Sequence, residues 1–230
     1  MRTIYMAVVV LGLIGMMMTG SAIAAEVIIA APTDDVYIWS AFPDTNYNYY
    51  PESTKLIAGH SYIGPHDQHS LLRFDLSALP DDAVVTSAGL YVYCLPTCDE
   101  VVYAHRMGHD DWDEDLTTWN TYEPYLGDAL LLDWHRVRVV AYETPNYWEC
   151  WDLMAMDWQT DLADNVLTLL LRASPESMNY FSPANMASKE FQDVEGNYYR
   201  PYLLIDYVPE PATMGLLGVG LLALLRRRAA

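Results

Sequence analysis

Short apolar runs separated by turn residues make up most of the chain. In Ser70–Asp75 the apolar positions alternate, so that Leu72 and Phe74 share one face while Arg73 shares the other with Asp75. This period of two is typical of a half-buried strand, and it predicts that Arg73 is a structural ion-pair partner. The same signal predicts strands at Val27–Ala31, Val36–Trp39, Lys55–Ala58, Ser70–Asp75, Ala83–Tyr93, Val101–Met107, Val137–Tyr142, Val166–Arg172 and Tyr202–Tyr207.

Two of these runs carry bulky residues on both faces. They are Tyr91-Val92-Tyr93 and Tyr202–Tyr207, and they predict that two sheets pack against each other. No period of roughly 20–50 residues repeats, which argues against a solenoid or a propeller. Many short strands with Pro, Gly and Asn turns favour an all-β fold, a sandwich or a jelly roll. We expect 46–51 and Ser174–Gly196 to be surface loops.

One stretch, Trp151–Asp164, has helical spacing. Met154, Trp158 and Leu162 recur every four residues and would form one apolar stripe, and Asn165 is a suitable residue to end the helix. The spacing therefore predicts a short helix that closes one end of the sandwich.

The N-terminus has the three parts of a secretory signal peptide. Arg2 precedes an apolar run from Met6 to Met18, and small residues end at Ala24. The run is shorter than the roughly 20 apolar residues that cross a bilayer. We therefore expect signal peptidase to cleave after Ala24 and to remove residues 1–24.

The C-terminus carries a proline–acid–proline triplet, a Gly-containing apolar stretch over Ala212–Leu225 and an arginine cluster. The triplet and the cluster are Pro209, Glu210, Pro211, Arg226, Arg227 and Arg228. An apolar segment this short is a weak anchor, and the arginines would keep its end in the cytoplasm. Transient membrane insertion of 209–230 is predicted, which leaves 25–208 as one domain.

This C-terminal arrangement resembles the PEP-CTERM sorting signal. The resemblance implies a Gram-negative bacterium in which an exosortase recognises and cleaves the protein near the triplet. It also implies transient anchoring in the inner membrane, followed by a place at the cell surface or in the extracellular, exopolysaccharide matrix.

The net charge of the chain limits the classes of partner that we expect it to bind. It has 12 Lys+Arg against 31 Asp+Glu, a net charge of −19, and Arg2 and the three terminal arginines lie in the two removable segments. Phosphate binding needs a basic surface, so nucleic acid is excluded as the expected partner. An acidic surface suits a soluble extracellular protein, calcium binding or simply resistance to aggregation, and the last of these is the commonest reason for it.

Several runs, taken in order, resemble the DNRLRE domain, a secreted jelly-roll module related to a carbohydrate-binding module family. The runs are DDVYIW, NYNYY, SLLRFDLSALPDDAVVTSAGLYVY, WDEDLTTWN, WECWDLMAMDWQTDLADNVLTLLLR and RPYLLIDY. The resemblance implies a jelly-roll β-sandwich that binds polysaccharide without catalysis. A purely structural surface protein is one alternative, and a polysaccharide hydrolase or lyase is another because the domain is also related to archaeal disaggregatase.

Calcium is the cofactor that this resemblance implies. A jelly-roll module often holds the ion between its first and last strands, which here carry Asp34, Asp35 and Asp206. The acidic segment Asp110–Asp115 is a second candidate, because calcium takes 6–8 oxygen ligands. Its spacing is not that of an EF-hand, so a solvated loop is the alternative.

Other side chains with metal or sulfur chemistry carry weaker signals. We interpret His60, His66 and His69 as surface histidines rather than zinc ligands, since no helix fixes their spacing. Cys94 and Cys98 could form a disulfide across a small loop, which would leave Cys150 free.

No nucleophile elbow, HExxH or P-loop motif is present, and the aromatic residues favour sugar binding instead. The chain has 7 Trp and 18 Tyr but only 4 Phe. Such amphipathic rings stack on the apolar faces of sugars. The aromatic residues expected in loops, and therefore predicted to bind carbohydrate, are Tyr47, Tyr49, Tyr50, Trp112, Tyr122 and Tyr125.

Overall fold

The computed structural model describes residues 24–29, 31–60, 66–96, 98–139, 147–174 and 183–209. Strands dominate this part of the chain. They are β1 (Ala25–Ile29), β2 (Asp34–Trp39), β3 (Lys55–His60), β4 (Asp67–Asp75), β5 (Val84–Cys94), β6 (Cys98–Arg106), β7 (Leu130–Val139), β8 (Tyr147–Asp152), β9 (Val166–Ala173), β10 (Ala184–Ala187) and β11 (Tyr202–Val208). The helical elements are η1 (Glu52–Thr54), α2 (Trp119–Tyr122), η2 (Glu123–Asp128) and α3 (Trp158–Asp164).

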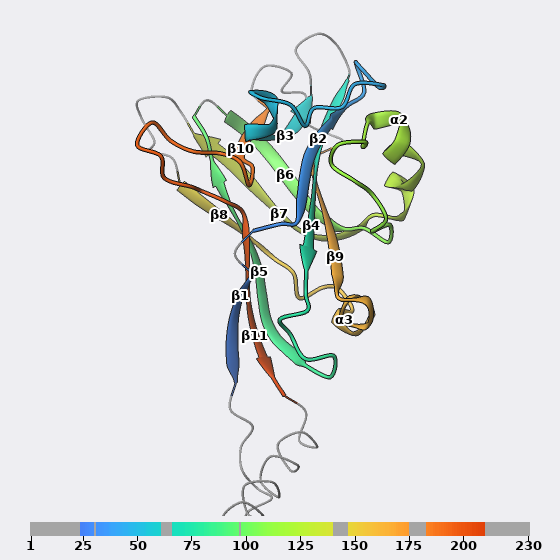
Figure 1. Cartoon of the computed structure of the whole chain (residues 1–230), viewed down its shortest axis with the longest axis vertical. Helices are drawn as coiled ribbons and strands as arrows, with labels where there is room; N and C mark the ends of the chain where they lie inside the picture. Colours follow the sequence, from blue (N-terminus) through green and yellow to red (C-terminus); the bar gives the residue numbers. More distant parts are fainter. Residues whose placement is uncertain are drawn as a thin grey trace, which may run out of the picture.

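The strands form two antiparallel sheets of a β-sandwich (Figure 1). In sheet A, β5 lies between β11 and β8, β1 extends the β11 side, and β10 pairs with the end of β5. Sheet B has the order β2–β4–β9–β6–β7. The all-β prediction is therefore confirmed.

β3 joins the two sheets. Its first residues pair with β10 of sheet A, whereas Gly59 and His60 pair with β4 of sheet B. A Cβ added at Gly59 would lie 2.4 Å from the Pro183 Cβ. Glycine is therefore needed where the strand passes from one sheet to the other, because any side chain would collide with the chain beside it.

The main core lies between the sheets. Leu90 and Val92 of β5 are fully buried there against Phe74 of β4 and Leu169 of β9. Trp151 of β8 is also fully buried, and its Nε1 donates a hydrogen bond to the carbonyl of Val102 in the opposite sheet at 3.1 Å. Strand alternation thus brings inward residues of β5 and β8 in one sheet, and of β4, β6 and β9 in the other, into one apolar layer.

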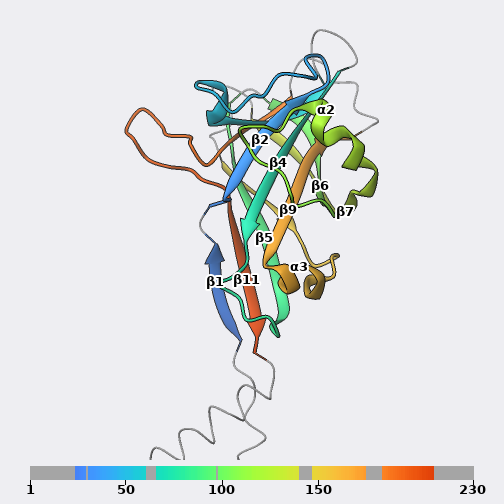
Figure 2. The ribbon, with the colours of Figure 1, turned by 45° about the vertical axis from the view of Figure 1, so that its right-hand side comes forward.

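A second cluster covers part of the outer side of sheet B. Ile38, Leu71 and Leu170 pack there against Trp112 and Tyr122 from the segment between β6 and β7. Figure 2 shows α2 beside the strands of this sheet. The segment that follows β6 is therefore a packed cover, which positions the acidic residues that it carries.

The structure corrects several sequence predictions. Residues 151–152 complete strand β8, so the helix is α3 alone and begins with Asp157 as its N-cap. Trp158 and Leu162 are buried as predicted, whereas Met154 is 39% exposed. Asn165 ends the helix in the left-handed conformation, with φ of 62°.

Besides β8, which is absent from the predicted strands, two strands were missed or shortened by the sequence pattern. β10 lies inside the segment that was predicted to be a surface loop, and it pairs with β3 over its whole length. β7 begins at Leu130, several residues before the predicted start at Val137. Both strands lack a clear period-two signal because β10 is very short and the first residues of β7 are exposed at an edge.

Ala24 and Pro209 lie at the same end of the domain, because β1 pairs antiparallel with β11 and Ala25 is opposite Tyr207. Figure 1 shows this end as an extension of β1, β11 and β5 beyond the rest of the fold. The rest of the predicted signal peptide and sorting segment lies outside the described residues. Within the described part of the chain, no helix is long and apolar enough to cross a membrane.

Candidate functional site

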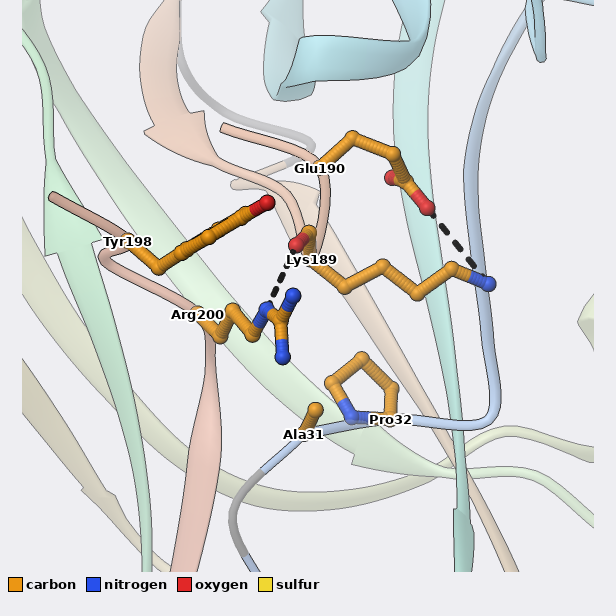
Figure 3. Close-up of a pocket in the computed structure, with 6 residues that line it drawn as sticks. All are labelled: Ala31, Pro32, Lys189, Glu190, Tyr198 and Arg200. Atoms are coloured by element: carbon orange, nitrogen blue, oxygen red, sulfur yellow. Dashed lines mark hydrogen bonds and ion pairs between the residues drawn. The ribbon is translucent and has the colours of Figure 1, made fainter. Parts of the chain in front are cut away.

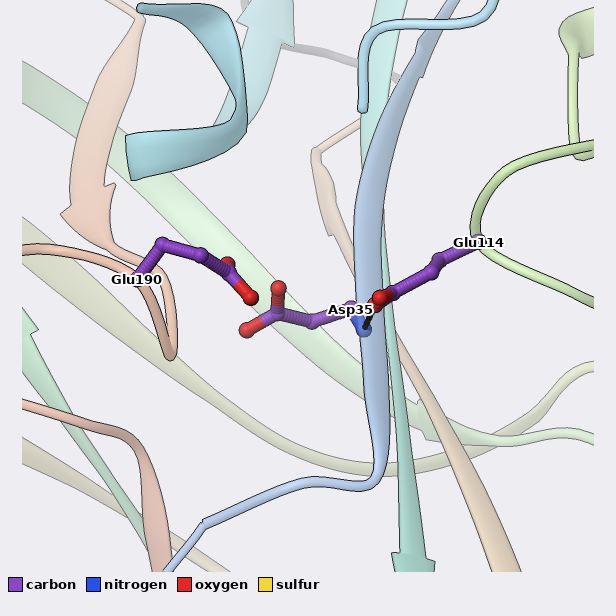
Figure 4. A group of neighbouring side chains, drawn as sticks. All are labelled: Asp35, Glu114 and Glu190. Carbon is purple, nitrogen blue, oxygen red and sulfur yellow. Dashed lines mark hydrogen bonds between the residues drawn. The ribbon is translucent and has the colours of Figure 1, made fainter. Parts of the chain in front are cut away.

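Three carboxylates from distant segments meet beside β2, and we call them the carboxylate cluster. Asp35 is the second residue of β2, Glu114 lies in the segment after β6, and Glu190 follows β10. One oxygen from each lies within 4.8 Å of the others. In Figure 4 the carboxylates of Asp35 and Glu190 point toward each other, while Glu114 approaches from the opposite side.

Strand alternation and two hydrogen-bonded contacts position the cluster. Asp35 lies on the same side of β2 as Tyr37 and is only 2% exposed. Its backbone N–H donates to Glu114 Oε2 at 3.0 Å. The side-chain amide of Asn46 donates to the carbonyls of Glu114 and Thr117 at 2.6 and 2.8 Å, which holds the acidic segment in place.

Lys189 brings one positive charge to the cluster. Its Nζ donates to the carboxylate of Glu114 and, at 2.7 Å, to the carbonyl of Thr33. The same ammonium lies 3.7 Å from the carboxylate of Glu190, and the backbone N–H of Lys189 donates to Asp35 Oδ2 at 2.8 Å. One ammonium therefore faces three carboxylates, so negative charge remains in excess when all three are ionised.

This excess changes the proton affinity of the groups. Burial, followed by the charge of Glu190, raises the pKa of Asp35 well above its usual range. Burial also raises the pKa of Glu190, and the charge of Glu114 adds to the effect. Burial by itself would lower the pKa of Lys189, but its hydrogen bond to Glu114 and the surrounding carboxylates raise it. A proton or a further cation would relieve the repulsion.

The donor set fits a hard divalent cation. Asp35 Oδ1 is buried and has no hydrogen-bond partner among the described residues. Carboxylate and carbonyl oxygens, such as those of Glu190 and Thr33, are the ligands that calcium takes in flexible geometry. After Lys189 is counted, two negative charges remain, and one divalent ion would balance them.

An open pocket adjoins the cluster (Figure 3). Its volume is about 380 Å³, and its lining residues are Ala31, Pro32, Lys189, Glu190, Tyr198 and Arg200. The guanidinium of Arg200 lies over the Tyr198 ring, 4.1 Å from its centroid, and Arg200 Nε donates to the carbonyl of Lys189 at 3.0 Å. We call this the polar pocket.

The polar pocket combines an aromatic ring with charged hydrogen-bonding groups. Tyr198 is 53% exposed, and the pocket volume falls within the roughly 300–1,000 Å³ of small-molecule sites. A ligand with apolar faces and many hydroxyl groups could use both kinds of contact.

The residues predicted to bind calcium are only partly brought together. Asp34 forms an ion pair with Arg73, which confirms Arg73 as a structural ion-pair partner. Asp206 lies opposite Glu26 in the β1–β11 extension, beyond the point where β1 leads to β2. The predicted set of Asp34, Asp35 and Asp206 is therefore corrected, and only Asp35 belongs to the carboxylate cluster.

Two cluster residues come from segments for which the sequence left other interpretations open. Glu114 belongs to the acidic segment that was the second calcium candidate. Glu190, together with Tyr198 and Arg200, falls in or just after the segment predicted to be a surface loop. The mixture of Lys, Glu, Tyr and Arg in 189–200 was the available signal, although its spacing has no fixed period.

The aromatic residues predicted to bind carbohydrate divide into two groups. Tyr47, Trp112 and Tyr122 are between 1% and 7% exposed. Tyr47 stacks on Tyr37 with ring centroids 4.4 Å apart, and Trp112 Nε1 donates to the Thr168 hydroxyl at 3.0 Å. These three are core residues, so the expectation that they present a stacking face is corrected.

The remaining three predicted aromatic residues are more accessible. Tyr49 is 51% and Tyr50 83% exposed, and neither lines the polar pocket. Tyr125 is half-buried and stacks against His109 with centroids 3.5 Å apart. A role for these residues in sugar binding stays a prediction.

The expectation that His69 is a surface residue is wrong. His69 is 7% exposed and lies beside Arg172 and His60 at a small cleft of about 100 Å³. Burial, followed by the charge of Arg172, lowers the pKa of His69 to about 3. His60 is hydrogen-bonded to Asp67 at 2.7 Å. No metal-ligand group of three that includes these histidines occurs in the described residues.

The predicted Cys94–Cys98 disulfide lies outside the described side chains, because that of Cys98 is not among them. Cys150 is half-buried in β8 and is a free thiol, whereas the pairing of Cys94 with Cys98 stays a prediction. Burial raises the pKa of Cys150, which makes the thiolate scarce at neutral pH.

The fold and the pocket together define a β-sandwich domain with a shallow polar pocket. The chain belongs to carbohydrate-binding module family 96, whose sequence model matches residues 27–190. The PEP-CTERM protein-sorting motif matches residues 208–229. No curated protein matches the chain.

These matches agree with the two resemblances drawn from the sequence, although they support a carbohydrate-binding module and not DNRLRE by name. The family indicates carbohydrate binding by a non-catalytic domain. The motif indicates export and membrane-anchored sorting by an exosortase in a Gram-negative bacterium.

Proposed function

We propose that this protein is an exported, non-catalytic jelly-roll module that binds polysaccharide through the polar pocket and holds a calcium ion at the carboxylate cluster. Signal peptidase would cleave after Ala24, and an exosortase would act near Pro209–Pro211. The mature domain would then reach the cell surface or the exopolysaccharide matrix.

The observation that carries this proposal is the polar pocket in a member of a carbohydrate-binding family. Tyr198 offers a ring for the apolar face of a sugar, while Arg200 and Glu190 offer a donor and an acceptor for hydroxyl groups. Glu190 also belongs to the carboxylate cluster. A calcium ion there would hold Glu190 and the neighbouring segment in one position, so sugar affinity would depend on calcium.

A purely structural surface protein is the second candidate. The burial of Tyr47, Trp112 and Tyr122 favours it, because these aromatic residues serve packing and not an exposed stacking face. The two candidates differ in one measurable property, which is the binding of soluble polysaccharide.

The test is thermal unfolding of the purified protein with calcium or EDTA, repeated with a panel of neutral and acidic polysaccharides. A ligand that binds only the folded state raises the melting temperature by mass action. We expect a rise with calcium and a further rise with at least one polysaccharide. No shift with any polysaccharide would favour the structural candidate.

Two variants locate the site. Tyr198→Ala should weaken polysaccharide binding roughly tenfold, since one well-placed aromatic contact accounts for about 1.4 kcal/mol. Tyr50→Ala removes a more exposed tyrosine outside the pocket and should leave binding unchanged. The reverse result would move the binding site to the loop at 46–51.

A further inference from the structure

The outer face of sheet A carries a group of aromatic side chains on three neighbouring strands. In β5, Leu90 and Val92 are fully buried in the core, so Tyr91 and Tyr93 project from the opposite face. In β8 the same alternation turns Trp148 outward, because Trp151 lies in the core.

The strand register brings these outward side chains together. Tyr91 is directly opposite Tyr202 of β11, and Tyr93 is directly opposite Trp148. The rings of Tyr91 and Tyr202 are stacked, with centroids 4.8 Å apart and an interplanar angle of 2°. Tyr199, just before β11, stacks on Tyr93 with centroids 4.2 Å apart. We call these five residues the aromatic face.

Trp148 connects the two stacked pairs. Its ring lies 5.3 Å from that of Tyr93 and 5.2 Å from that of Tyr202, at 62° and 67°. It is 39% exposed, and the four tyrosines keep partial exposure. The rings therefore support one another in fixed positions while remaining in contact with solvent, which limits the side-chain entropy lost on binding.

The aromatic face continues along the sheet without a bulky side chain at Gly89. A Cβ added there would lie 2.9 Å from Cys150 Sγ and 3.2 Å from the ring of Tyr91. Leu204 is the outward neighbour on β11 in register with Gly89. Beyond the rings the surface therefore continues through the Cys150 sulfur and Leu204, and it ends at the exposed carboxylate of Asp152, which is directly opposite Gly89.

Charge distinguishes this surface from the rest of the molecule. On β5, β8 and β11, the outward positions among the rings carry no ionisable acid or base other than tyrosine and Cys150. The carboxylates nearest to the rings on these described strands and in the segment before β11 lie at the margins: Asp152 and Asp206 lie toward one end, and Asp193 at the other end accepts a hydrogen bond from the Tyr199 hydroxyl at 3.1 Å. A polyanion would find no cation among the outward residues of these three strands and would be repelled by a chain of net charge −19.

We propose that the aromatic face is a second glycan-binding surface, which takes an uncharged polysaccharide chain by stacking sugar rings on Trp148 and the neighbouring tyrosines. The tyrosine hydroxyls would pair with sugar hydroxyls at the edges of the contact. The inference rests on the proposed carbohydrate-binding function, but it concerns a different sheet surface, different residues and a neutral ligand class.

The test is affinity electrophoresis of the purified protein in gels that contain hydroxyethyl cellulose, xylan or glucomannan. We expect at least one of these neutral polymers to retard the protein. Trp148→Ala should lower the affinity roughly two- to tenfold, the range for one aromatic contact. Trp134→Ala is the matched control, because Trp134 is 56% exposed on β7 of the other sheet and should leave the mobility unchanged.

A second variant and a second measurement keep the result interpretable. Tyr93→Leu retains apolar volume in the sheet but removes the ring between Trp148 and Tyr199, and it should lower the affinity in the same direction. Melting temperatures of both variants would report any loss of folding. Sedimentation equilibrium would report whether the surface instead joins two copies of the chain.

Three outcomes would overturn the inference. They are no retardation by any of the neutral polymers, equal retardation of Trp148→Ala and the unchanged protein, and a dimer that Trp148→Ala dissociates. The proposed function has a separate criterion, since Tyr198→Ala and calcium act on the polar pocket. Loss of the aromatic-face effect with retention of the Tyr198 effect would reject this inference alone.

Discussion

The polar pocket and the aromatic face are built in opposite ways. The carboxylate cluster beside the pocket draws Asp35, Glu114 and Glu190 from three segments far apart in the sequence, and its energetics depend on charge and burial. The aromatic face arises from alternation and register within three adjacent strands, and its energetics depend on ring contacts. The stability of the polar pocket should therefore depend on cations and pH, whereas that of the aromatic face should depend on the size of the side chains in it.

The largest effect is expected from removing the ammonium group of Lys189, the one positive charge that faces the carboxylate cluster. Lys189→Met leaves three carboxylates without their ammonium, so in EDTA the free energy of unfolding should fall by about 2–3 kcal/mol, somewhat less than for a fully buried pair. Calcium should restore most of the loss, because it replaces the missing charge. Urea denaturation with EDTA or calcium measures both.

Lys55→Met is the control for this variant. Lys55 pairs with Glu52 at 3.6 Å but its side chain is 39% exposed, so its removal should cost less than about 1 kcal/mol and show no calcium dependence. Equal effects of the two substitutions would contradict the special role of the carboxylate cluster.

On the aromatic face, added volume should have the next largest effect. Gly89→Ala places a methyl group 2.9 Å from Cys150 Sγ, and overpacking of this kind costs about 1–3 kcal/mol. The double variant Gly89→Ala/Cys150→Ala should recover part of the loss, because the sulfur is removed. Urea denaturation should give the same values with EDTA and with calcium.

Truncation of Trp148 should cost less. Trp148 is 39% exposed on β8 at the margin of sheet A, and its two closest ring contacts, with Tyr93 and Tyr202, together account for roughly 1 kcal/mol. Trp148→Ala should therefore lower the melting temperature slightly while it reduces neutral-polysaccharide binding clearly. A large fall in stability would mean that the ring serves packing rather than binding.

The smallest expected effect is on the pH dependence of stability. The pKa values of Asp35 and Glu190 are raised in the folded state, so the folded protein binds these protons more tightly than the unfolded chain. In EDTA this contribution to stability is present at acid pH. It is lost as the pH rises from the pKa values of the unfolded chain, about 4, toward the higher pKa values of the folded protein. Asp35→Asn should flatten this fall, and calcium should do so in the unchanged protein. Thermal unfolding between pH 4 and 7 is the measurement, and an unaltered slope in Asp35→Asn would contradict the assignment.

The sequence pattern was most reliable where alternation was strong. Ser70–Asp75 and Val166–Arg172 are central strands, and their predicted inward residues, such as Phe74, are fully buried. The pattern failed at the start of Trp151–Asp164, where the spacing of Met154, Trp158 and Leu162 predicts one helix. Trp151 belongs to strand β8 and Met154 is 39% exposed, so only Trp158 and Leu162 form the buried side of α3.

The candidate sites were less predictable than the strands. Tyr91, Tyr93 and Tyr202 place bulky residues on the second face of their strands, which by itself indicates only that two sheets pack together. Which of these residues share a surface depends on strand order, because β8 lies beside β5 only in the folded sheet. Glu190 could not be matched with Asp35 from the sequence, since no local spacing relates them.

The amino-acid sequence by itself determined the all-β class, the acidic character and the C-terminal sorting motif, because each depends on local composition or on a period within one segment. Only the tertiary structure decided that Trp112 and Tyr122 are core residues, that Asp35 meets Glu114 and Glu190, and that the aromatic rings lie side by side. These depend on which strands pair and which face of each is covered, and that choice is made by packing between segments far apart in the chain.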